Sequence, residues 1–138
     1  LFNMGWKQVA SLTSVTFSRF GDLRTGNKRD PEYGDWGKRE HKQAFINNRD
    51  SMIVNDDYNV QTPSGYDQFG LLQKFLFRQS ENISHVLNLQ FTTTNDIPRY
   101  DRLTETEDDG TFSHAQWYYG PQTRLHAAYE FKNGLSHK

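Results

Sequence analysis

The stretch His-Val-Leu-Asn-Leu-Gln-Phe-Thr-Thr-Thr, residues 85–94, alternates apolar and polar side chains with a period of two. Its apolar positions are Leu87, Leu89 and Phe91, and its polar positions include Asn88, Gln90, Thr92 and Thr94. Period two predicts a β-strand, because successive side chains of a strand point to opposite faces of the sheet. The pattern extends over about the 9–11 residues that a tilted strand needs to cross a bilayer.

Two other stretches repeat this alternation, and a third resembles it. Asp67–Arg78 carries Phe and Leu on one side, and Thr123–Lys132 alternates apolar residues with charged ones. The segment from Gly5 is rich in Val, Thr and Phe, which suit a pleated surface, but its small polar residues fall on both faces. We therefore expect four strands, over Gly5–Phe20, Gly65–Arg78, Ile83–Thr94 and Thr123–Lys132.

The connections between these strands alternate in length. Gly21–Ser64 and Asn95–Gln122 are long, whereas Gln79–Asn82 is a short polar turn and Asn133-Gly134 signals another. Long loops on one side of a sheet and short turns on the other are typical of an outer-membrane barrel. Inside the long connections, Lys42–Ile46 and Met52–Val54 predict a short hairpin, and Phe112–Tyr119 predicts an extension of the strands.

The composition agrees with a barrel and argues against a helical membrane protein and a nucleic-acid-binding protein. The chain has 138 residues, 34% hydrophobic residues, 14% aromatic residues, a net charge of −1 and no cysteine. It lacks the apolar run of about 18 residues that a membrane helix needs. Its charge predicts no nucleic-acid partner, and without cysteine it has no disulfides. Because Leu1 is not a start Met and a turn signal stands near the other end, we expect an internal piece of a longer protein.

The predicted fold is therefore an all-β antiparallel meander that forms part of a transmembrane β-barrel, with long extracellular loops and short periplasmic turns. Four strands cannot close, since the smallest such barrels have about eight, so isolated residues 1–138 are expected to aggregate. The side chains assigned to lipid are Phe69, Leu71, Phe75, Phe77, Leu87, Leu89 and Phe91. Those assigned to the lumen are Lys74, Arg78, Asn88, Gln90, Arg124 and Glu130. An interfacial aromatic girdle is expected at Trp6, Phe20, Tyr66, Trp117, Tyr118, Tyr119, Tyr129 and Phe131.

Motifs for catalysis, metals or cofactors do not occur. No pair of the five histidines, His137 included, has the HxxxH spacing of metal ligands, and there is no GxSxG or phosphate-binding glycine motif. Asp56-Asp57 and Asp108-Asp109-Gly110 lack the order of oxygens of a calcium loop. We expect neither an enzyme nor a bound cofactor.

Two loop segments combine arginines with aromatic rings. Ile97–Leu103 contains Arg99 and Arg102, and the segment that begins at Trp117 continues with Tyr118 and Tyr119. Arginine with aromatic rings can bind anionic or planar ligands, so these five residues are the candidate ligand-binding set. The same side chains can instead lock the loops together by Arg–Asp pairing and ring stacking.

Several long phrases carry a resemblance to a known family. Ser64–Gln68 leads into Leu71–Phe77, Leu87–Thr104 follows, and then Trp117–Gln122; Phe20–Gly26 lies upstream. In this order the phrases resemble the barrel of TonB-dependent outer-membrane receptors of the Bacteroidetes type. The resemblance covers nearly the whole chain.

That resemblance implies a nutrient importer of the bacterial cell outer membrane. Such receptors take up small ligands such as iron chelates, haem or cobalamin through a barrel of about 22 strands that holds a plug. The partners implied are outer-membrane lipid, the nutrient, and TonB, which acts through a plug and N-terminal region that these residues do not include. A soluble β-sandwich that binds carbohydrate is the alternative, and an outer-membrane enzyme or adhesin barrel is a third possibility.

Overall fold

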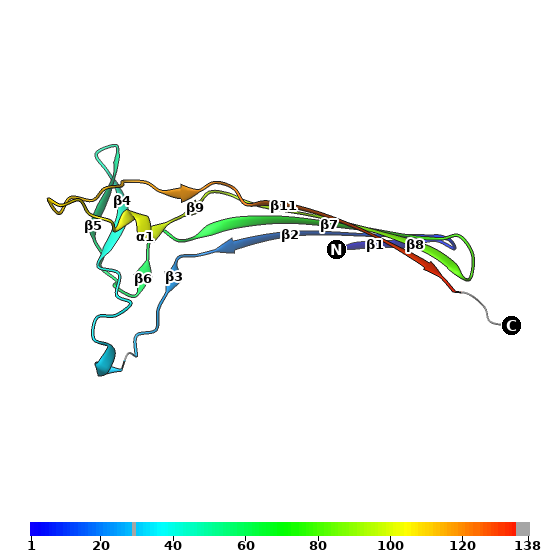
Figure 1. Cartoon of the computed structure of the whole chain (residues 1–138), viewed down its shortest axis with the longest axis horizontal. Helices are drawn as coiled ribbons and strands as arrows, with labels where there is room; N and C mark the ends of the chain where they lie inside the picture. The colour runs from blue at the N-terminus through cyan, green and yellow to red at the C-terminus, as the bar shows by residue number, and fades with distance from the viewer. Residues whose placement is uncertain (29, 135–138) are drawn as a thin grey trace. The chain divides into compact units, whose positions relative to one another are not determined.

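The structure is a computed structural model that describes residues 1–28 and 30–134, so His137 lies outside the described residues. Its largest element is one antiparallel sheet in the order β1-β2-β7-β8-β11, in which each strand neighbours the next one along the chain (Figure 1). These strands are β1 Phe2–Gly5, β2 Val9–Phe20, β7 Tyr66–Arg78, β8 Ile83–Thr94 and β11 Thr123–Asn133. The all-β antiparallel meander is confirmed. The sheet is open, with β1 and β11 at its two edges.

The long connections contain short elements of their own. The predicted hairpin is confirmed as β4 with β5, which pair from His41↔Val54 to Ile46↔Arg49. Leu23 and Arg24 pair with Gln61 and Val60. The remaining elements are β3 Leu23–Arg24, η1 Pro31–Tyr33, β4 His41–Ile46, β5 Arg49–Val54, β6 Val60–Gln61, β9 Ile97–Pro98, α1 Tyr100–Leu103 and β10 Tyr118–Tyr119. No helix within residues 1–28 and 30–134 is long and apolar enough to cross a membrane.

The chain divides into two compact units. The strand unit comprises Leu1–Ser18, Asp67–Thr94 and Gln122–Lys138. The loop unit comprises Arg19–Tyr66 and Asn95–Pro121, so it unites the two long connections although β7 and β8 separate them in sequence.

Two sequence predictions were wrong in detail. The strand expected over Gly5–Phe20 begins only at Val9, because the N–H of Trp6 donates to the carbonyl of Val9 at 2.7 Å and closes a turn. The residues before this turn, Phe2–Gly5, form the separate strand β1. The main sheet therefore has five strands rather than four. The extension expected over Phe112–Tyr119 contains only the two-residue strand β10 and an isolated bridge from Phe112 to Thr106.

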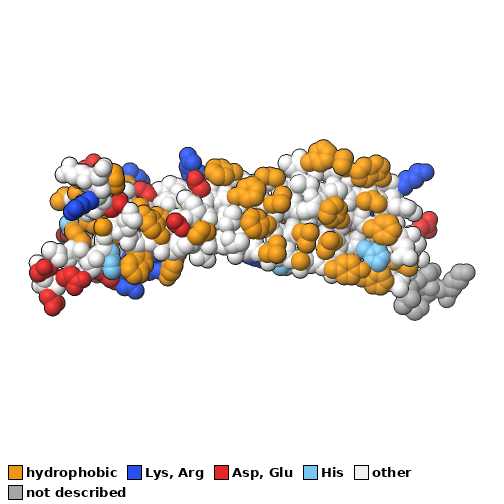
Figure 2. All heavy atoms as spheres, turned by 90° about the horizontal axis from the view of Figure 1, so that it is seen from above, with side chains coloured by type: hydrophobic (Ala, Val, Ile, Leu, Met, Phe, Trp, Pro, Cys, Tyr) orange, Lys and Arg blue, Asp and Glu red, His pale blue; other side chains and the backbone are white. Residues whose placement is uncertain are grey.

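The pairing register places the apolar residues of three strands on one face. Leu71 lies opposite Phe91, which lies opposite Leu125 on the other side. Phe75, Leu87 and Tyr129 form a parallel row four residues further along the strands. Side chains directly opposite one another in an antiparallel pair share a face, so these rows form a continuous apolar surface. Figure 2 shows the hydrophobic side chains gathered there.

Hydrogen bonds decide the orientation of β2, which the sequence left open. The Thr13 hydroxyl donates to Gln73 at 2.6 Å, and the Gln73 amide donates to the Ser11 hydroxyl at 2.9 Å. Gln73 alternates with Leu71 and Phe75, so the odd positions of β2 share their face. Exposed apolar residues of the first two strands therefore extend the surface, namely Phe2, Met4, Val9, Val15 and Phe17. The three polar side chains satisfy one another within it.

The sheet has no second layer in the part of the chain that the structure describes. None of its described residues is buried, and Leu125 on the apolar face is 77% exposed. The buried residues of the described chain are Tyr100, Leu103 and Asn55, all in the loop unit. A β-sandwich instead buries one face of each sheet against the other. The described chain therefore lacks a sandwich core.

A close backbone approach occurs where the first long connection begins and ends. A Cβ added at Gly65 would lie 2.8 Å from the carbonyl oxygen of Phe20 and 3.3 Å from the carbonyl carbon of Gly21. Beside it, the rings of Phe20 and Tyr66 stack with centroids 4.7 Å apart. Glycine is required at position 65 because the neighbouring atoms are backbone and cannot rotate away.

We predict that Gly65→Ala destabilises the protein by about 1–3 kcal/mol, the usual cost of overpacking. Gly120→Ala is the matched control, because a Cβ there meets nothing within 4 Å and the loss of chain entropy in the unfolded state is the same. The thermal unfolding midpoint of the full protein measures the difference. Equal midpoints for the two variants would show that the approach at Gly65 does not exist.

Candidate functional site

The two loop segments chosen from the sequence lie side by side in the loop unit. Tyr118 pairs with Pro98 and Tyr119 with Ile97, so β10 and β9 form a small antiparallel ribbon. The N–H of Arg99 extends it by donating to the carbonyl of Trp117 at 2.9 Å. Four of the five candidate residues are therefore on, or directly next to, one ribbon, and Arg102 lies in the short helix α1 that follows.

Arg99 is held between a carboxylate and an aromatic ring. Its Nε donates to Asp101 at 2.7 Å, and its guanidinium carbon lies 4.6 Å from the centroid of Tyr119. The hydrogen bond to Asp101 raises the pKa of Arg99, and the same bond lowers the pKa of Asp101. Arg99 is thus a permanent cation whose charge already has a partner.

Arg102 repeats the arrangement one helical turn later. Its guanidinium donates to Glu105 at 2.5 Å and lies 5.7 Å from the ring centroid of Trp117. The ring of His114 packs on Trp117 with centroids 4.5 Å apart, and its Nε2 lies 3.8 Å from Glu105. We call Arg99, Asp101, Tyr119, Arg102, Glu105, His114 and Trp117 the arginine–aromatic clip.

The geometry of the clip supports the locking role that the sequence left open. Each arginine is bonded to a carboxylate three residues away or nearer, and each covers a ring from the other segment. Tyr118 and Tyr119 remain exposed and Trp117 is 39% exposed, so their outer surfaces stay accessible. Ligand binding by the five residues stays a prediction.

Asn55 is a buried hub that sequence reasoning missed. It is 4% exposed, and its Nδ2 donates to the carbonyls of Arg39 at 2.9 Å and Val60 at 2.8 Å. Its Oδ1 accepts from the N–H of Asp57 at 3.1 Å. In the sequence Asn55-Asp56-Asp57 has the composition of a solvated loop tip, and no local pattern indicates that its first residue is buried.

Tyr100 and Leu103 of α1 form the small core of the loop unit. Leu103 is fully buried, and the Tyr100 hydroxyl donates to the carbonyl of His41 in β4. Burial raises the pKa of Tyr100, and the hydrogen bond only partly opposes this. The bond joins the first long connection to the second. The sequence placed Tyr100 between two candidate residues but gave no sign of its burial.

An open hollow of about 500 Å³ adjoins this core. Its lining includes Lys38, Arg39 and His41 from the first long connection and Tyr100 and Phe112 from the second. The rings of His41 and Phe112 meet edge to face with centroids 4.9 Å apart. The structure places none of the five predicted binding residues in this lining.

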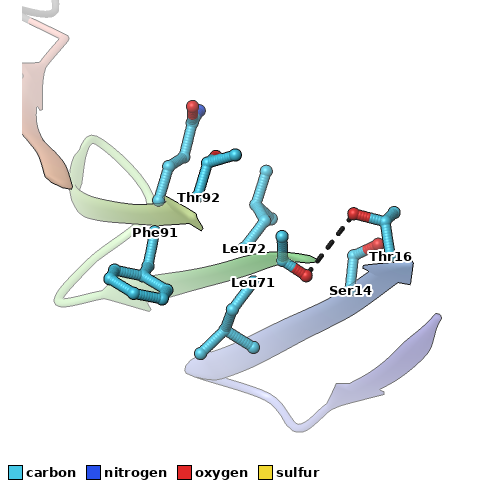
Figure 3. A pocket seen from close by; sticks show the side chains of 8 residues that line it. Ser14, Thr16, Leu71, Leu72, Phe91 and Thr92 are labelled. Carbon is cyan, nitrogen blue, oxygen red and sulfur yellow. Dashed lines mark hydrogen bonds between the residues drawn. The ribbon is translucent and has the colours of Figure 1, made fainter. Parts of the chain in front are cut away.

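A smaller hollow of about 210 Å³ lies on the sheet at Gly70 (Figure 3). Leu72, Thr92, Ser14 and Thr16 project on one side of the strands, and Leu71 and Phe91 project on the other. The Thr16 hydroxyl lies where a side chain at position 70 would stand, 2.5 Å from an added Cβ. The hollow is thus a gap left by glycine on the more polar face. Its lining combines hydroxyl and amide side chains with leucines and Phe91, and it contains no charged group.

Metal ligands do not gather in the described part of the chain. Within residues 1–28 and 30–134, no group of three or more histidine or acidic side chains could hold an ion.

Asp22 clamps the two ends of the first long connection. One carboxylate oxygen accepts from the N–H groups of Ser64 at 2.8 Å and Gly65 at 2.9 Å, and the other accepts from the Thr62 hydroxyl at 2.6 Å. Partial burial pushes the pKa of Asp22 upward, but the three hydrogen bonds outweigh it, so the pKa lies below its ordinary value of 3.8. The charged form of Asp22 therefore stabilises the folded state.

We predict that Asp22→Asn lowers the free energy of unfolding at neutral pH and makes that free energy depend less on pH in the acid range. The folded pKa of Asp22 is depressed, so its contribution is present above the unfolded pKa of about 3.9 and disappears as pH falls through the folded value. Chemical unfolding at pH 7 and at pH 3 measures both effects, with the exposed Asp108→Asn as control. The clamp is refuted if the Asp22 and Asp108 variants show the same pH profile.

Comparison of the chain with family models, with curated proteins and with solved structures gives no match. The residues and their geometry therefore carry the functional argument by themselves.

Proposed function

We propose that this chain is an arc of the β-barrel of a TonB-dependent outer-membrane receptor that imports a small nutrient. The observation that carries the proposal is the antiparallel sheet with one continuous apolar face that no layer of the described residues covers. Such a face needs an apolar environment, because large exposed apolar patches are rare on soluble monomers. Lipid supplies that environment for the outer face of a barrel.

The strand lengths support a membrane location. β2, β7, β8 and β11 contain 12, 13, 12 and 11 residues. Each reaches or exceeds the about 9–11 residues that a tilted strand needs to span the hydrocarbon core.

The short turns lie at one end of the sheet and the long connections at the other, which also supports a barrel that spans the outer membrane. The N–H of Arg78 donates to the carbonyl of Gln8, so the β1–β2 turn and the β7–β8 turn share one end of the sheet. Both long connections start and finish at the other end. In an outer-membrane barrel the short turns face the periplasm and the long loops face the exterior.

Aromatic side chains cluster at the short-turn end, as an interfacial girdle requires. The ring of His85 packs on Phe131 with centroids 5.2 Å apart and on Phe77 with centroids 5.9 Å apart. Its Nδ1 lies 2.6 Å from the Tyr129 hydroxyl, and its Nε2 lies 3.2 Å from Gln79. The cluster combines apolar rings with satisfied polar tips, which suits the boundary between acyl chains and headgroups.

The two edge strands of the sheet, β1 and β11, need partners that the described strands do not provide. In lipid every backbone N–H and C=O must be bonded internally, so β1 and β11 need further strands beside them. The opposite face carries Lys74, Asn88, Gln90, Arg124 and Glu130 and would line the lumen. Leu12, Leu72, Leu76 and Val86 interrupt that polar face by the same alternation. The sandwich alternative is weaker because the described residues provide no buried core for it.

Ligand capture is assigned to the loop unit. Its two long connections carry the exposed rings of Trp117, Tyr118 and Tyr119 and the paired cations Arg99 and Arg102. In the proposed mechanism the loops bind the nutrient, and a plug and TonB, which lie outside this chain, govern its passage through the lumen.

The barrel is tested by blotting the outer-membrane fraction of the source cell with antibody to this segment, with and without heating. We expect a band far larger than 16.2 kDa that shifts on heating, because a closed barrel resists detergent until it is boiled. A soluble band near 16.2 kDa without a heat shift would eliminate the transporter.

Loop capture is tested by alanine at Arg99, Arg102, Trp117, Tyr118 and Tyr119, one at a time, in the full receptor. We expect reduced nutrient uptake and affinity at one or more positions while the heat shift is unchanged. Exposed Tyr33→Ala, in the loop unit but outside the clip, is the control. Wild-type uptake and affinity in all five variants would remove these residues from the ligand site.

A further inference from the structure

We infer that the hollow lined by Lys38, Arg39, His41, Tyr100 and Phe112 binds a small planar aromatic anion, such as an aromatic carboxylate. The inference rests on the proposed function in that the hollow would serve as a capture site of the importer. Its binding chemistry follows from the loop unit alone and can be measured separately.

The size and composition of the hollow fit a small molecule. Its volume of about 500 Å³ falls within the range of about 300–1,000 Å³ typical of ligand sites. Both long connections contribute to it, since residues 38–41 lie in the first and residues 100–112 in the second. A ligand seated there touches both connections at once.

The aromatic part of the lining is held in place before any ligand binds. Tyr100 is 6% exposed, and its hydroxyl is bonded to the backbone of His41, so it forms a fixed floor. The half-buried rings of His41 and Phe112 meet edge to face at an interplanar angle of 70°. Fixed rings lose little conformational freedom when a planar ligand packs against them.

Arg39 gives the hollow its preference for an anion. Its Nε donates to the amide oxygen of Gln61 at 2.9 Å, and its guanidinium carbon lies 5.7 Å from the Tyr100 centroid. The clip arginines Arg99 and Arg102 differ, because each already holds a carboxylate. The partner of Arg39 is a neutral amide, which orients the guanidinium without neutralising it.

The other charged groups of the lining are Lys38 and Glu40. Lys38 contacts the lining but is paired with Asp35, and Glu40 is exposed. Arg39, whose side chain is bonded to the Gln61 amide, is thus the lining cation that is not already paired with a carboxylate among the described residues. A guanidinium matches the planar, two-oxygen geometry of a carboxylate, which favours that group over a single-point anion.

The test titrates the full receptor with 2-naphthoate, with its neutral analogue 2-naphthamide and with the non-aromatic cyclohexanecarboxylate. We expect 2-naphthoate to bind most tightly, because it alone offers both the ring and the charge. Arg39→Gln should raise its Kd at least about tenfold, as expected for loss of a hydrogen bond to a charged group. Phe112→Leu should weaken 2-naphthoate but leave the weak binding of cyclohexanecarboxylate unchanged.

Two variants make the result independent of misfolding. Arg24→Gln removes an arginine of the same unit that pairs with Asp57 at 2.9 Å and does not line the hollow, so it should bind 2-naphthoate normally. Arg39→Lys keeps the charge without the planar fork and should give an intermediate Kd. Equal affinity for 2-naphthoate and 2-naphthamide, no binding of 2-naphthoate, or unchanged binding by Arg39→Gln would each overturn the inference. If the receptor shifts on heating but does not bind 2-naphthoate, the site is disproved and the barrel is not. If 2-naphthoate binds but no heat shift occurs, the barrel is disproved and the site is not.

Discussion

The alignment of β7 with β8, which sets Leu71 opposite Phe91 and Phe75 opposite Leu87, is the constraint on which the sheet depends. Because side chains alternate with period two, a slip of one residue would carry the apolar set of one strand to the other face. The short turn after Arg78 fixes this alignment, since the N–H of Gln79 donates to the carbonyl of Ile83 at 2.9 Å. β11 pairs with the other side of β8 and sets Leu125 opposite Phe91, so the apolar surface extends over three strands.

The loop unit is stabilised by a different kind of interaction. Its elements are too short to bury much apolar surface, and only Tyr100 and Leu103 form a hydrophobic core among its described residues. Asn55 donates hydrogen bonds to backbone carbonyls, and Asp22 accepts them from backbone N–H groups. The contacts of the clip add to these bonds. Asn55 is buried, and a buried polar group specifies a conformation because leaving its hydrogen-bonding atoms unsatisfied is costly. This explains how two long connections can present defined surfaces.

The two modes of stabilisation suit two different roles, one for the sheet and one for the loop unit. A sheet with an uncovered apolar face supports a role at an apolar boundary, and its open edges require neighbours. A polar, hydrogen-bonded loop unit supports recognition, because loops that are ordered by networks can place side chains reproducibly. Within it the arginines have separate roles, since those of the clip contact carboxylates and Arg39 contacts a neutral amide. The charge available to a ligand therefore depends on which partner each guanidinium has.

The sequence by itself determined the strands β7, β8 and β11, their apolar face, the short turn between β7 and β8, and the β4–β5 hairpin. These features depend on local periodicity and turn chemistry, which neighbouring residues encode. Only the tertiary structure decided the orientation of β2, the burial of Asn55 and Tyr100, and the hollow around Arg39. The partners there are distant in the chain: Tyr100 bonds to His41, 59 residues away, and Thr13 to Gln73, 60 residues away. Local patterns cannot reveal such contacts, because the groups are far apart in the sequence and only the folded chain brings them together.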